Sequence, residues 1–202
     1  GSLTVTSTTF IRQLSYFSVS VLDLIFRKCG LELIHVERND MKGGSIRVVG
    51  QHVSGKRKLD DSVEKFLADE LSAKFDSRET YRAFDTAVQI KGQRLNNMLS
   101  DFVANGKRIV GYGASHSTTT LIYHFGIGKY LEYLVDDNEL KHSCVSPGLH
   151  IPVFPSAKIN EDCPDYVLVL AWQHGASIIE RNPQFIGAGG KFVLPLPELR
   201  VI

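Results

Sequence analysis

Two glycines and a row of hydroxyl residues follow a short apolar run in the middle of the chain. Gly111 and Gly113 come directly after this run, and the hydroxyl residues begin at Ser117. A strand, a glycine turn and a helix in this order are typical of anion sites, because the first helical turn has free N–H groups at the positive end of the helix dipole. We therefore expect phosphate groups to bind at this turn. The residues expected to contact the ligand here are Gly111, Gly113, Ala114, Ser117, Thr118 and Thr120.

An acidic residue ends the next expected strand. In dinucleotide-binding folds a carboxylate at this position accepts hydrogen bonds from a ribose, and Asp136 stands there in this sequence. The third glycine of the G-x-G-x-x-G pattern, which lets helix and strand pack closely, is replaced by His116. Two interpretations therefore stay open. One is a nucleotide site with Asp136 as the ribose partner, and the other is a pair of glycines that only shapes the turn of a sheet without nucleotide.

Two histidines and a Trp–Gln pair are further candidates for contact with the ligand. His116 stands on the glycine turn, and imidazole is a common acid or base near neutral pH. His150 could touch the ligand or could hold its own loop by hydrogen bonds. Trp172 and Gln173 follow an expected strand at its carboxyl end, where open α/β sheets bind their ligands. The indole of Trp172 could instead pack in the core.

These candidates lie on a series of short apolar runs separated by helical stretches. Such an alternation predicts an α/β fold, a mostly parallel sheet with helices on both faces. The expected strands cover residues 109–111, 130–135, 151–154, 166–170 and 192–194.

The N-terminal part of the chain has a different pattern. The apolar spacing predicts a helix over residues 18–29, and strands over 31–36 and 45–49 joined by a turn at 40–44. One helix and two strands are too little for a core of their own and are typical of the edge of a larger domain. The charged stretch at 50–60 loses this periodicity, which indicates a linker.

Two helices with apolar stripes come next. Asp76 and Glu79 have the spacing of a capping box at the start of the second helix. The predicted organisation is a domain remnant at 1–52, a linker at 53–59 and an α/β domain at 60–202.

The composition limits the classes of function. A formal net charge of +1 gives no general attraction to nucleic acid, and no apolar run of roughly 18 residues predicts a membrane span, so we expect neither partner. Cys29, Cys144 and Cys163 are widely spaced, which argues against a structural zinc site and against a disulfide framework. We expect no metal, and a reducing cytoplasm as the location.

Several stretches resemble one enzyme family. The resemblance is carried by "GYGASHSTTTLIYHFGI", "LEYLVDDNELKHSCVSPGLHIPVFP", "PDYVLVLAWQHGASII" and "GGKFVLPLPELRVI". They are similar to the C-terminal domain of S-adenosylmethionine-dependent sugar C-methyltransferases, and "LSYFSVSVLDLIFRKCGLELIHVERNDMKGGSIRVV" resembles the end of their methyltransferase domain. The resemblance implies a Rossmann-like domain and a nucleotide-linked deoxysugar as the ligand, with S-adenosylmethionine as the cofactor.

The sequence also departs from this family. The glycine loop that binds S-adenosylmethionine in relatives is not in this chain, so we expect a methyltransferase region or a separate chain as a partner. Relatives carry Tyr-x-Glu-His before "SYFS", and its histidine is the expected base; here the positions are Phe10, Arg12 and Gln13. Because an amide is no base near pH 7, no catalytic residue is assigned, and His116 and His150 are weak candidates. Ser117 stands where relatives tend to have a lysine.

Three interpretations of the function follow. The first is the substrate-binding part of a sugar C-methyltransferase, with the isolated chain inactive. The second is a non-catalytic module that binds nucleotide sugars or other proteins. The third is a dinucleotide-dependent oxidoreductase, which the incomplete glycine pattern disfavours.

Overall fold

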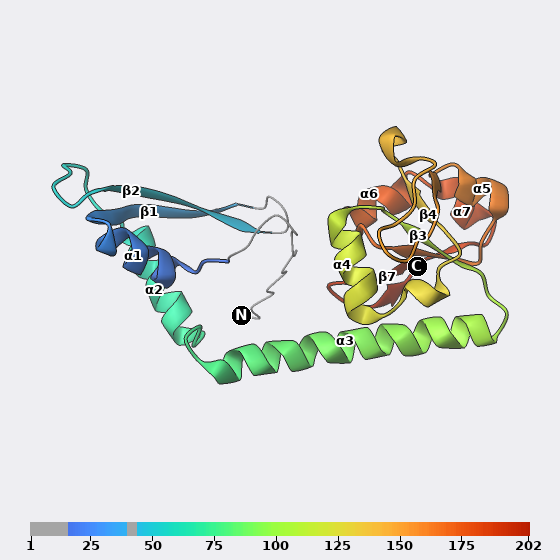
Figure 1. The fold of residues 1–202 in the computed structure, drawn as a ribbon, viewed down its shortest axis with the longest axis horizontal. Helices are drawn as coiled ribbons and strands as arrows, with labels where there is room; N and C mark the ends of the chain where they lie inside the picture. The colour runs from blue at the N-terminus through green and yellow to red at the C-terminus, as the bar shows by residue number, and fades with distance from the viewer. Residues whose placement is uncertain (1–15, 40–43) are drawn as a thin grey trace. The chain divides into compact units, whose positions relative to one another are not determined.

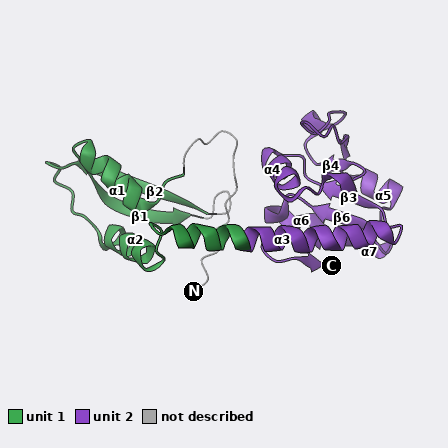
Figure 2. Ribbon diagram, turned by 60° about the horizontal axis from the view of Figure 1, so that its bottom comes forward, with its two compact units in different colours: residues 1–86 green, residues 87–202 purple. Residues whose placement is uncertain are grey.

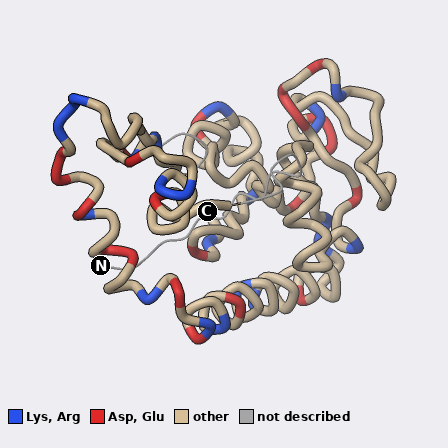
Figure 3. Tube along the Cα trace, turned by 60° about the vertical axis from the view of Figure 1, so that its left-hand side comes forward, with Lys and Arg blue, Asp and Glu red and all other residues tan. Residues whose placement is uncertain are grey.

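A computed structural model describes residues 16–39 and 44–202 (Figure 1). Its contacts divide the chain into two compact units, and the boundary falls inside one long helix, α3 (Arg78–Ala104). Unit 1 ends at Thr86, and unit 2 begins at Ala87 (Figure 2). Basic and acidic residues are interspersed along the described trace (Figure 3).

Unit 1 is built on an antiparallel hairpin, as the sequence predicts. β1 (Leu31–Asn39) pairs with β2 (Ser45–His52), and two helices, α1 (Val19–Lys28) and α2 (Asp61–Ser72), pack against the hairpin. The predicted turn falls largely on residues 40–43, which lie outside the described residues. The buried residues of this small core are Val19, Leu33, Val36 and Val63.

The start of α2 is hydrogen-bonded to β1. The backbone N–H of Asp60 donates to the carbonyl of Ile34 (3.0 Å), and the N–H of Val36 donates to Ser62 Oγ (2.8 Å). The predicted linker at 53–59 is therefore no break in packing, because the residues after it pack on those before it. Whether two family domains meet there stays a prediction.

The cap of helix α3 lies one residue later than the sequence predicts. The side chain of Ser77 accepts a hydrogen bond from Thr80 N (3.4 Å) and donates to Glu79 Oε2 (2.8 Å). The capping residue is thus Ser77, and the prediction of Asp76 was wrong by one position. Both residue types cap helices well, so sequence alone could not choose between them.

The sheet of unit 2 confirms the predicted α/β class. Its order is β5-β4-β3-β6-β7-β8, with β3 to β7 parallel and β8 antiparallel to β7. This is a Rossmann-like arrangement. The strands are β3 (Ile109–Tyr112), β4 (Leu134–Asp136), β5 (Val153–Pro155), β6 (Tyr166–Val169), β7 (Lys191–Leu194) and β8 (Arg200–Val201).

Three strands differ from the prediction, and one of them, β5, begins at Val153 rather than at residue 151. β4 begins at Leu134 rather than at residue 130, because only the last two residues of β3 pair with it and the register places Gly111 opposite Leu134. Residues before it form a 3-10 turn, η2 (Gly128–Tyr130). The strand β8 was not predicted, since two residues are too short to show a pattern.

Helices cover both faces of the sheet. Along β3, Ile109 packs towards α3 and α4, whereas Val110 packs towards the opposite layer. The C-terminal part of α3 contributes Leu95 and Leu99 to the first layer. No helix in the described ranges is long and apolar enough to cross a membrane. The remaining elements are α4 (His116–Phe125), α5 (Lys158–Asp162), α6 (Gly175–Glu180), α7 (Pro183–Gly187), η3 (Glu139–Lys141) and η4 (Trp172–His174).

Candidate anion site at the carboxyl edge of the sheet

The two halves of the sheet separate at β3. The chain runs from β3 to β4 and β5 on one side, then crosses to β6 and β7 on the other. Open α/β sheets bind ligands beyond the carboxyl ends of the strands at such a switch point. Here the turn after β3 meets the segment after β6, because the N–H groups of Leu170 and Ala171 both donate to the carbonyl of Tyr112 (2.9 and 3.1 Å). The predicted glycine turn and the predicted Trp172 segment therefore lie at one edge.

The two glycines of the turn have different roles. Gly111 lies inside β3, where a Cβ would come within 2.6 Å of Leu134 Cδ2 and 2.7 Å of Leu170 Cδ1. Core packing therefore accounts for this glycine. Gly113 follows β3 with φ of +110°, and a Cβ there would lie 2.8 Å from Ala171 Cβ. Only Gly113 shapes the turn.

The N-terminus of α4 has free backbone donors. Ser115 caps the helix, since its Oγ accepts from Thr118 N (3.3 Å) and its carbonyl from Thr119 N (3.0 Å). The N–H groups of His116 and Ser117 have no acceptor among the described residues. Two N–H groups at the positive end of a helix can bind an anionic oxygen.

The hydroxyl row is mostly engaged within the helix. Thr119 Oγ1 donates to the carbonyl of Ser115 (3.3 Å), and Thr120 Oγ1 donates to the carbonyl of His116 (3.2 Å). Thr118 is buried, with its hydroxyl 3.2 Å from Ser115 Oγ. Ser117 is half-buried, and its Oγ lies 2.8 Å from Ser115 Oγ. Among the hydroxyl side chains at 117–120, that of Ser117 is the one best placed beside the free N–H groups.

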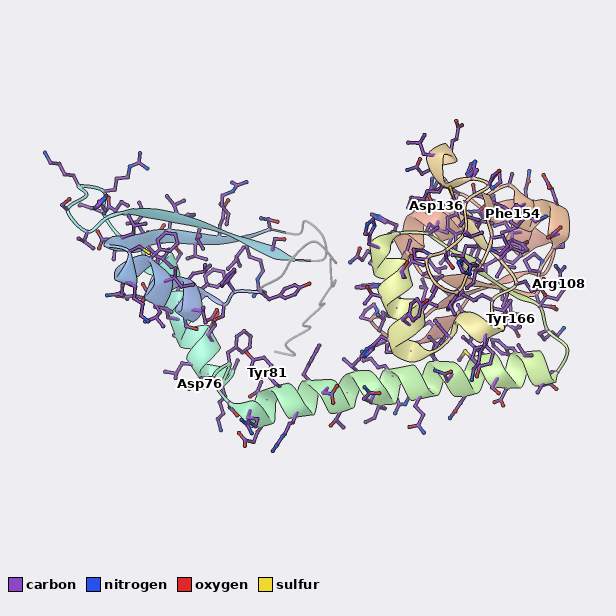
Figure 4. The ribbon with its side chains drawn as sticks, in the orientation of Figure 1. Asp76, Tyr81, Arg108, Asp136, Phe154 and Tyr166 are labelled. Atoms are coloured by element: carbon purple, nitrogen blue, oxygen red, sulfur yellow. The ribbon has the colours of Figure 1, made fainter. Side chains whose placement is uncertain are left out.

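The carboxylate of Asp136, a residue labelled in Figure 4, accepts hydrogen bonds from this chain's own donors. Ala114 N (2.7 Å) and Lys141 Nζ (2.9 Å) donate to Oδ2, and Asn138 N (2.9 Å) donates to Oδ1. Burial disfavours the charged form, but these three hydrogen bonds outweigh it and hold the pKa of Asp136 below its ordinary value. Oδ2 already accepts two hydrogen bonds and Oδ1 accepts one, which leaves a single acceptor position for a ribose diol with two hydroxyl groups. The structure therefore gives no support to the expected ribose contact.

The same observation tests the implied cofactor. S-adenosylmethionine and dinucleotides both carry a ribose, and the end of β4 is where a Rossmann-like fold would receive it. Because Asp136 is engaged and only 8% exposed, unit 2 does not fit this group at β4. No group of His, Cys, Asp and Glu residues suited to a metal ion was found in the described part of the chain.

The other predicted residues are divided between two edges. His116 is exposed at the first position of α4, and Trp172 and Gln173 lie in η4 beside the turn, half-buried and exposed respectively. His150 precedes β5 and lies on the amino-terminal side of the sheet, where its N–H donates to the carbonyl of Ser146 (3.0 Å). The structure thus does not bring His150 to the turn. Gln13 lies outside the described residues.

A neighbouring cluster was not predicted. Tyr112 donates to Asp137 Oδ1 (2.7 Å), and Arg181 pairs with Asp137 Oδ2 (3.1 Å). Burial disfavours ionisation of Asp137, but the Tyr112 hydroxyl and Arg181 keep the pKa of its carboxyl below the usual range. Lys141 and the Ser115 cap were also missed. A serine just before a helix is a recognisable cap signal, whereas nothing in the sequence links Lys141 to Asp136.

Fold and site together define a class: a Rossmann-like unit with a helix N-terminus exposed at the switch point of its sheet. The chain belongs to the C-methyltransferase C-terminal domain family, whose model matches residues 40–197. It is 32% identical over 196 residues to "C-methyltransferase NovU" of Streptomyces niveus, a match that covers 96% of this chain and 47% of that protein. The chain therefore spans about half the length of this curated relative.

Proposed function

We propose that unit 2 binds the nucleotide-linked sugar substrate of a C-methyltransferase, with the phosphate groups at the N-terminus of α4. The observation that carries the proposal is the pair of free N–H groups at His116 and Ser117, beside the Gly113 turn. Phosphate oxygens are acceptors that such donors and the helix dipole favour. Membership of the family and the name of the Streptomyces niveus relative support the link to C-methyl transfer.

The methyl donor is assigned to a site outside unit 2. Use of S-adenosylmethionine is implied by the family, and this group would supply an electrophilic methyl. The occupied carboxylate of Asp136 argues against a donor site at β4. We therefore propose that a methyltransferase region or a separate methyltransferase chain holds the donor.

The contribution of unit 2 is to bind and orient the sugar. Methylation of carbon needs an acidified C–H, a base and a methyl group held in line. The ketone of a nucleotide-linked deoxysugar would acidify the neighbouring carbon. Fixing its diphosphate at α4 would limit the positions that the sugar can take, and positioning of this kind accounts for a large share of catalysis.

Backbone substitution at His116 tests the anion site. His116→Pro removes one free N–H, and the fold tolerates proline there because Ser115 is already extended (φ −106°, ψ 174°). His116→Ala keeps this N–H and removes only the imidazole. We expect isothermal titration to show binding of uridine or thymidine diphosphate by wild type, and about tenfold weaker binding by the proline variant, the loss expected for a hydrogen bond to a charged group. Equal affinities of wild type and His116→Pro, or no binding at all, would overturn the proposal.

A methyl-transfer assay distinguishes the substrate-binding part of a C-methyltransferase from a non-catalytic binding module. Labelled S-adenosylmethionine and a keto-deoxysugar nucleotide are offered to the chain alone and with an added methyltransferase. We expect label on sugar carbon only in the second case. Nucleotide binding without transfer in either case would instead indicate a non-catalytic binding module.

A further inference from the structure

One carboxylate connects the candidate turn to the segment that follows β4. This segment, residues 138–142, is called the arm. Asp136 accepts from Ala114 N in the turn, and from Asn138 N and Lys141 Nζ in the arm. The imidazole Nε2 of His142 lies 2.8 Å from the carbonyl of Asp136, so the arm is bound to this residue through its backbone as well.

These hydrogen bonds hold the negative charge of Asp136 at a position that water hardly reaches. The Asp136 side chain is only 11% exposed, and a buried carboxylate without partners would cost several kcal/mol. Lys141 balances the charge at 2.9 Å, which also lessens repulsion between Asp136 and an incoming phosphate. Each of the three hydrogen bonds to the carboxylate involves an N–H donor with no other acceptor in the described contacts. The carboxylate is therefore oriented before any ligand arrives.

The bond to Ala114 acts at a sensitive point of the backbone. Ala114 lies between Gly113, whose φ of +110° turns the chain, and Ser115, which caps α4. Fixing the Ala114 N–H against Asp136 fixes the direction in which α4 begins. The free N–H groups of His116 and Ser117 follow immediately.

We infer that Asp136 is a positioning residue of the anion site: it sets the backbone of the β3–α4 turn and does not contact the ligand. The inference rests on the proposed function, and it replaces the ribose contact that the sequence suggested. A ligand held at α4 then meets an end of β4 that is closed by the arm, so its sugar must extend towards another part of the edge.

Two ligands distinguish positioning from contact. Inorganic pyrophosphate has no ribose, whereas uridine diphosphate has one. If Asp136 positions the turn, Asp136→Asn weakens both by the same factor, about tenfold, because an amide cannot accept from three donors. If Asp136 contacts the ribose, only uridine diphosphate is affected, and the inference is wrong. Unchanged affinity for both ligands would also overturn it.

The chain offers a matched control at the opposite edge of the sheet. Asp165 likewise accepts from a lysine, Lys107 Nζ (2.8 Å), and from a backbone N–H, that of Arg108 (2.9 Å). Asp165→Asn should lower the thermal midpoint by less, because the Asp165 side chain is 35% exposed and that of Asp136 11%, and it should leave both affinities at the wild-type value. If Asp136 only stabilised the fold, Asp136→Asn and Asp165→Asn would bind pyrophosphate and uridine diphosphate with the same affinities. That result would contradict the inference.

Two further measurements cover the remaining outcomes. If Asp136→Asn does not fold, Lys141→Gln removes one donor to the same carboxylate, and an equal loss for both ligands is expected; no loss overturns the inference. Hydrogen exchange needs no ligand: the amide of Ala114 should exchange faster in Asp136→Asn, while amides inside β3 stay protected. If wild type binds neither ligand but Ala114 responds in this way, the proposed function fails and the role of Asp136 in shaping the turn stands.

Discussion

At the scale of residues, two buried tyrosines, Tyr112 at the end of β3 and Tyr133 just before β4, differ in one hydrogen bond. Tyr112 and Tyr133 are 3% and 4% exposed. The hydroxyl of Tyr112 donates to Asp137 Oδ1 (2.7 Å), whereas the buried hydroxyl of Tyr133 has no hydrogen-bond partner within the part of the chain that the structure describes. Burial, and then the charge of nearby Asp162, raises the pKa of Tyr133. Its ring packs at right angles to that of Phe154.

We therefore expect opposite effects from the same substitution. Tyr133→Phe keeps the ring contact and removes a hydroxyl that lost its hydrogen bonds to water on folding and gained none in the protein. The free energy of unfolding should therefore stay unchanged or rise by up to about 1 kcal/mol. Tyr112→Phe should lower it by about 1–2 kcal/mol, because Asp137 loses a donor. Urea unfolding of both variants measures this. Equal losses in the two variants would contradict the interpretation.

Gly111 gives a second prediction at this scale. Gly111→Ala should lower the free energy of unfolding by about 1–3 kcal/mol, because the new methyl group would overlap the side chains of Leu134 and Leu170. Gly187→Ala is the control: nothing lies within 4 Å of its missing Cβ, and alanine there should be neutral or slightly stabilising. Urea unfolding again reports the difference. If Gly111→Ala left the free energy of unfolding unchanged, core packing would not account for this glycine, and Gly111 would again be a possible ligand contact.

At the scale of elements, a histidine and an aspartate anchor the start of α2 to β1. Asp60 accepts from Ser62 N (2.8 Å) as the cap of α2 and also hydrogen-bonds His35 Nδ1 on β1. The bond to Asp60 raises the pKa of His35 against the opposing effect of burial, and Glu37, with Oε2 at 3.8 Å from Nε2, adds to the rise. Hydrogen bonds from Ser62 and then from His35 lower the pKa of Asp60 to about 2.

The pH range in which this anchor stabilises the fold follows from the directions of the two pKa shifts: the pKa of His35 is raised and that of Asp60 is lowered. The contribution of His35 is complete below its unfolded pKa of about 6.5 and is lost as pH rises through the higher folded value. The contribution of Asp60 is complete above its unfolded pKa of about 3.9 and is lost as pH falls towards 2. The anchor is therefore strongest between about pH 4 and 6.5.

A proton NMR titration of the His35 ring tests this account. Asp60→Asn should lower the midpoint, because the largest cause of the raised pKa is removed. Asp61→Asn is the control, since Asp61 is the adjacent carboxylate and makes no contact with His35 in the described structure. A midpoint that does not move in Asp60→Asn would show that another group raises it.

Elements were predictable where their pattern is long. The helix at 19–28, the hairpin and the alternation from 109 to 194 follow from apolar spacing, and the structure confirms them. The site was predictable only in outline. The turn at Gly113 and the start of α4 can be read from residue types, but residue types do not show that the Thr120 hydroxyl donates back to the helix carbonyl of His116. The partners of Asp136 and the edge at which His150 lies depend on the path of a long connection, which no periodicity encodes.

At the scale of the whole molecule, the two units have separate cores. Unit 2 buries apolar residues on both faces of its sheet, whereas the core of unit 1 is confined to one side of a hairpin. The C-terminal part of α3 belongs to the core of unit 2, because Leu95 and Leu99 are 1% and 0% exposed there. The structural border of unit 2 therefore lies well after the predicted linker at 53–59.

Two fragments test whether unit 2 folds by itself. The fragment 77–202 keeps α3 with its Ser77 cap, and we expect a single cooperative urea transition and wild-type affinity for pyrophosphate. The fragment 106–202 lacks α3 and should not fold. Loss of a buried leucine side chain costs about 2–5 kcal/mol, so loss of both Leu95 and Leu99 is comparable to the total stability of a domain of this size.

An unfolded 77–202 would mean that unit 2 depends on unit 1, and a folded 106–202 would exclude α3 from the core. If 77–202 folds but does not bind pyrophosphate while the whole chain does, the anion site must include residues of unit 1, and its assignment to the α4 N-terminus alone would be wrong.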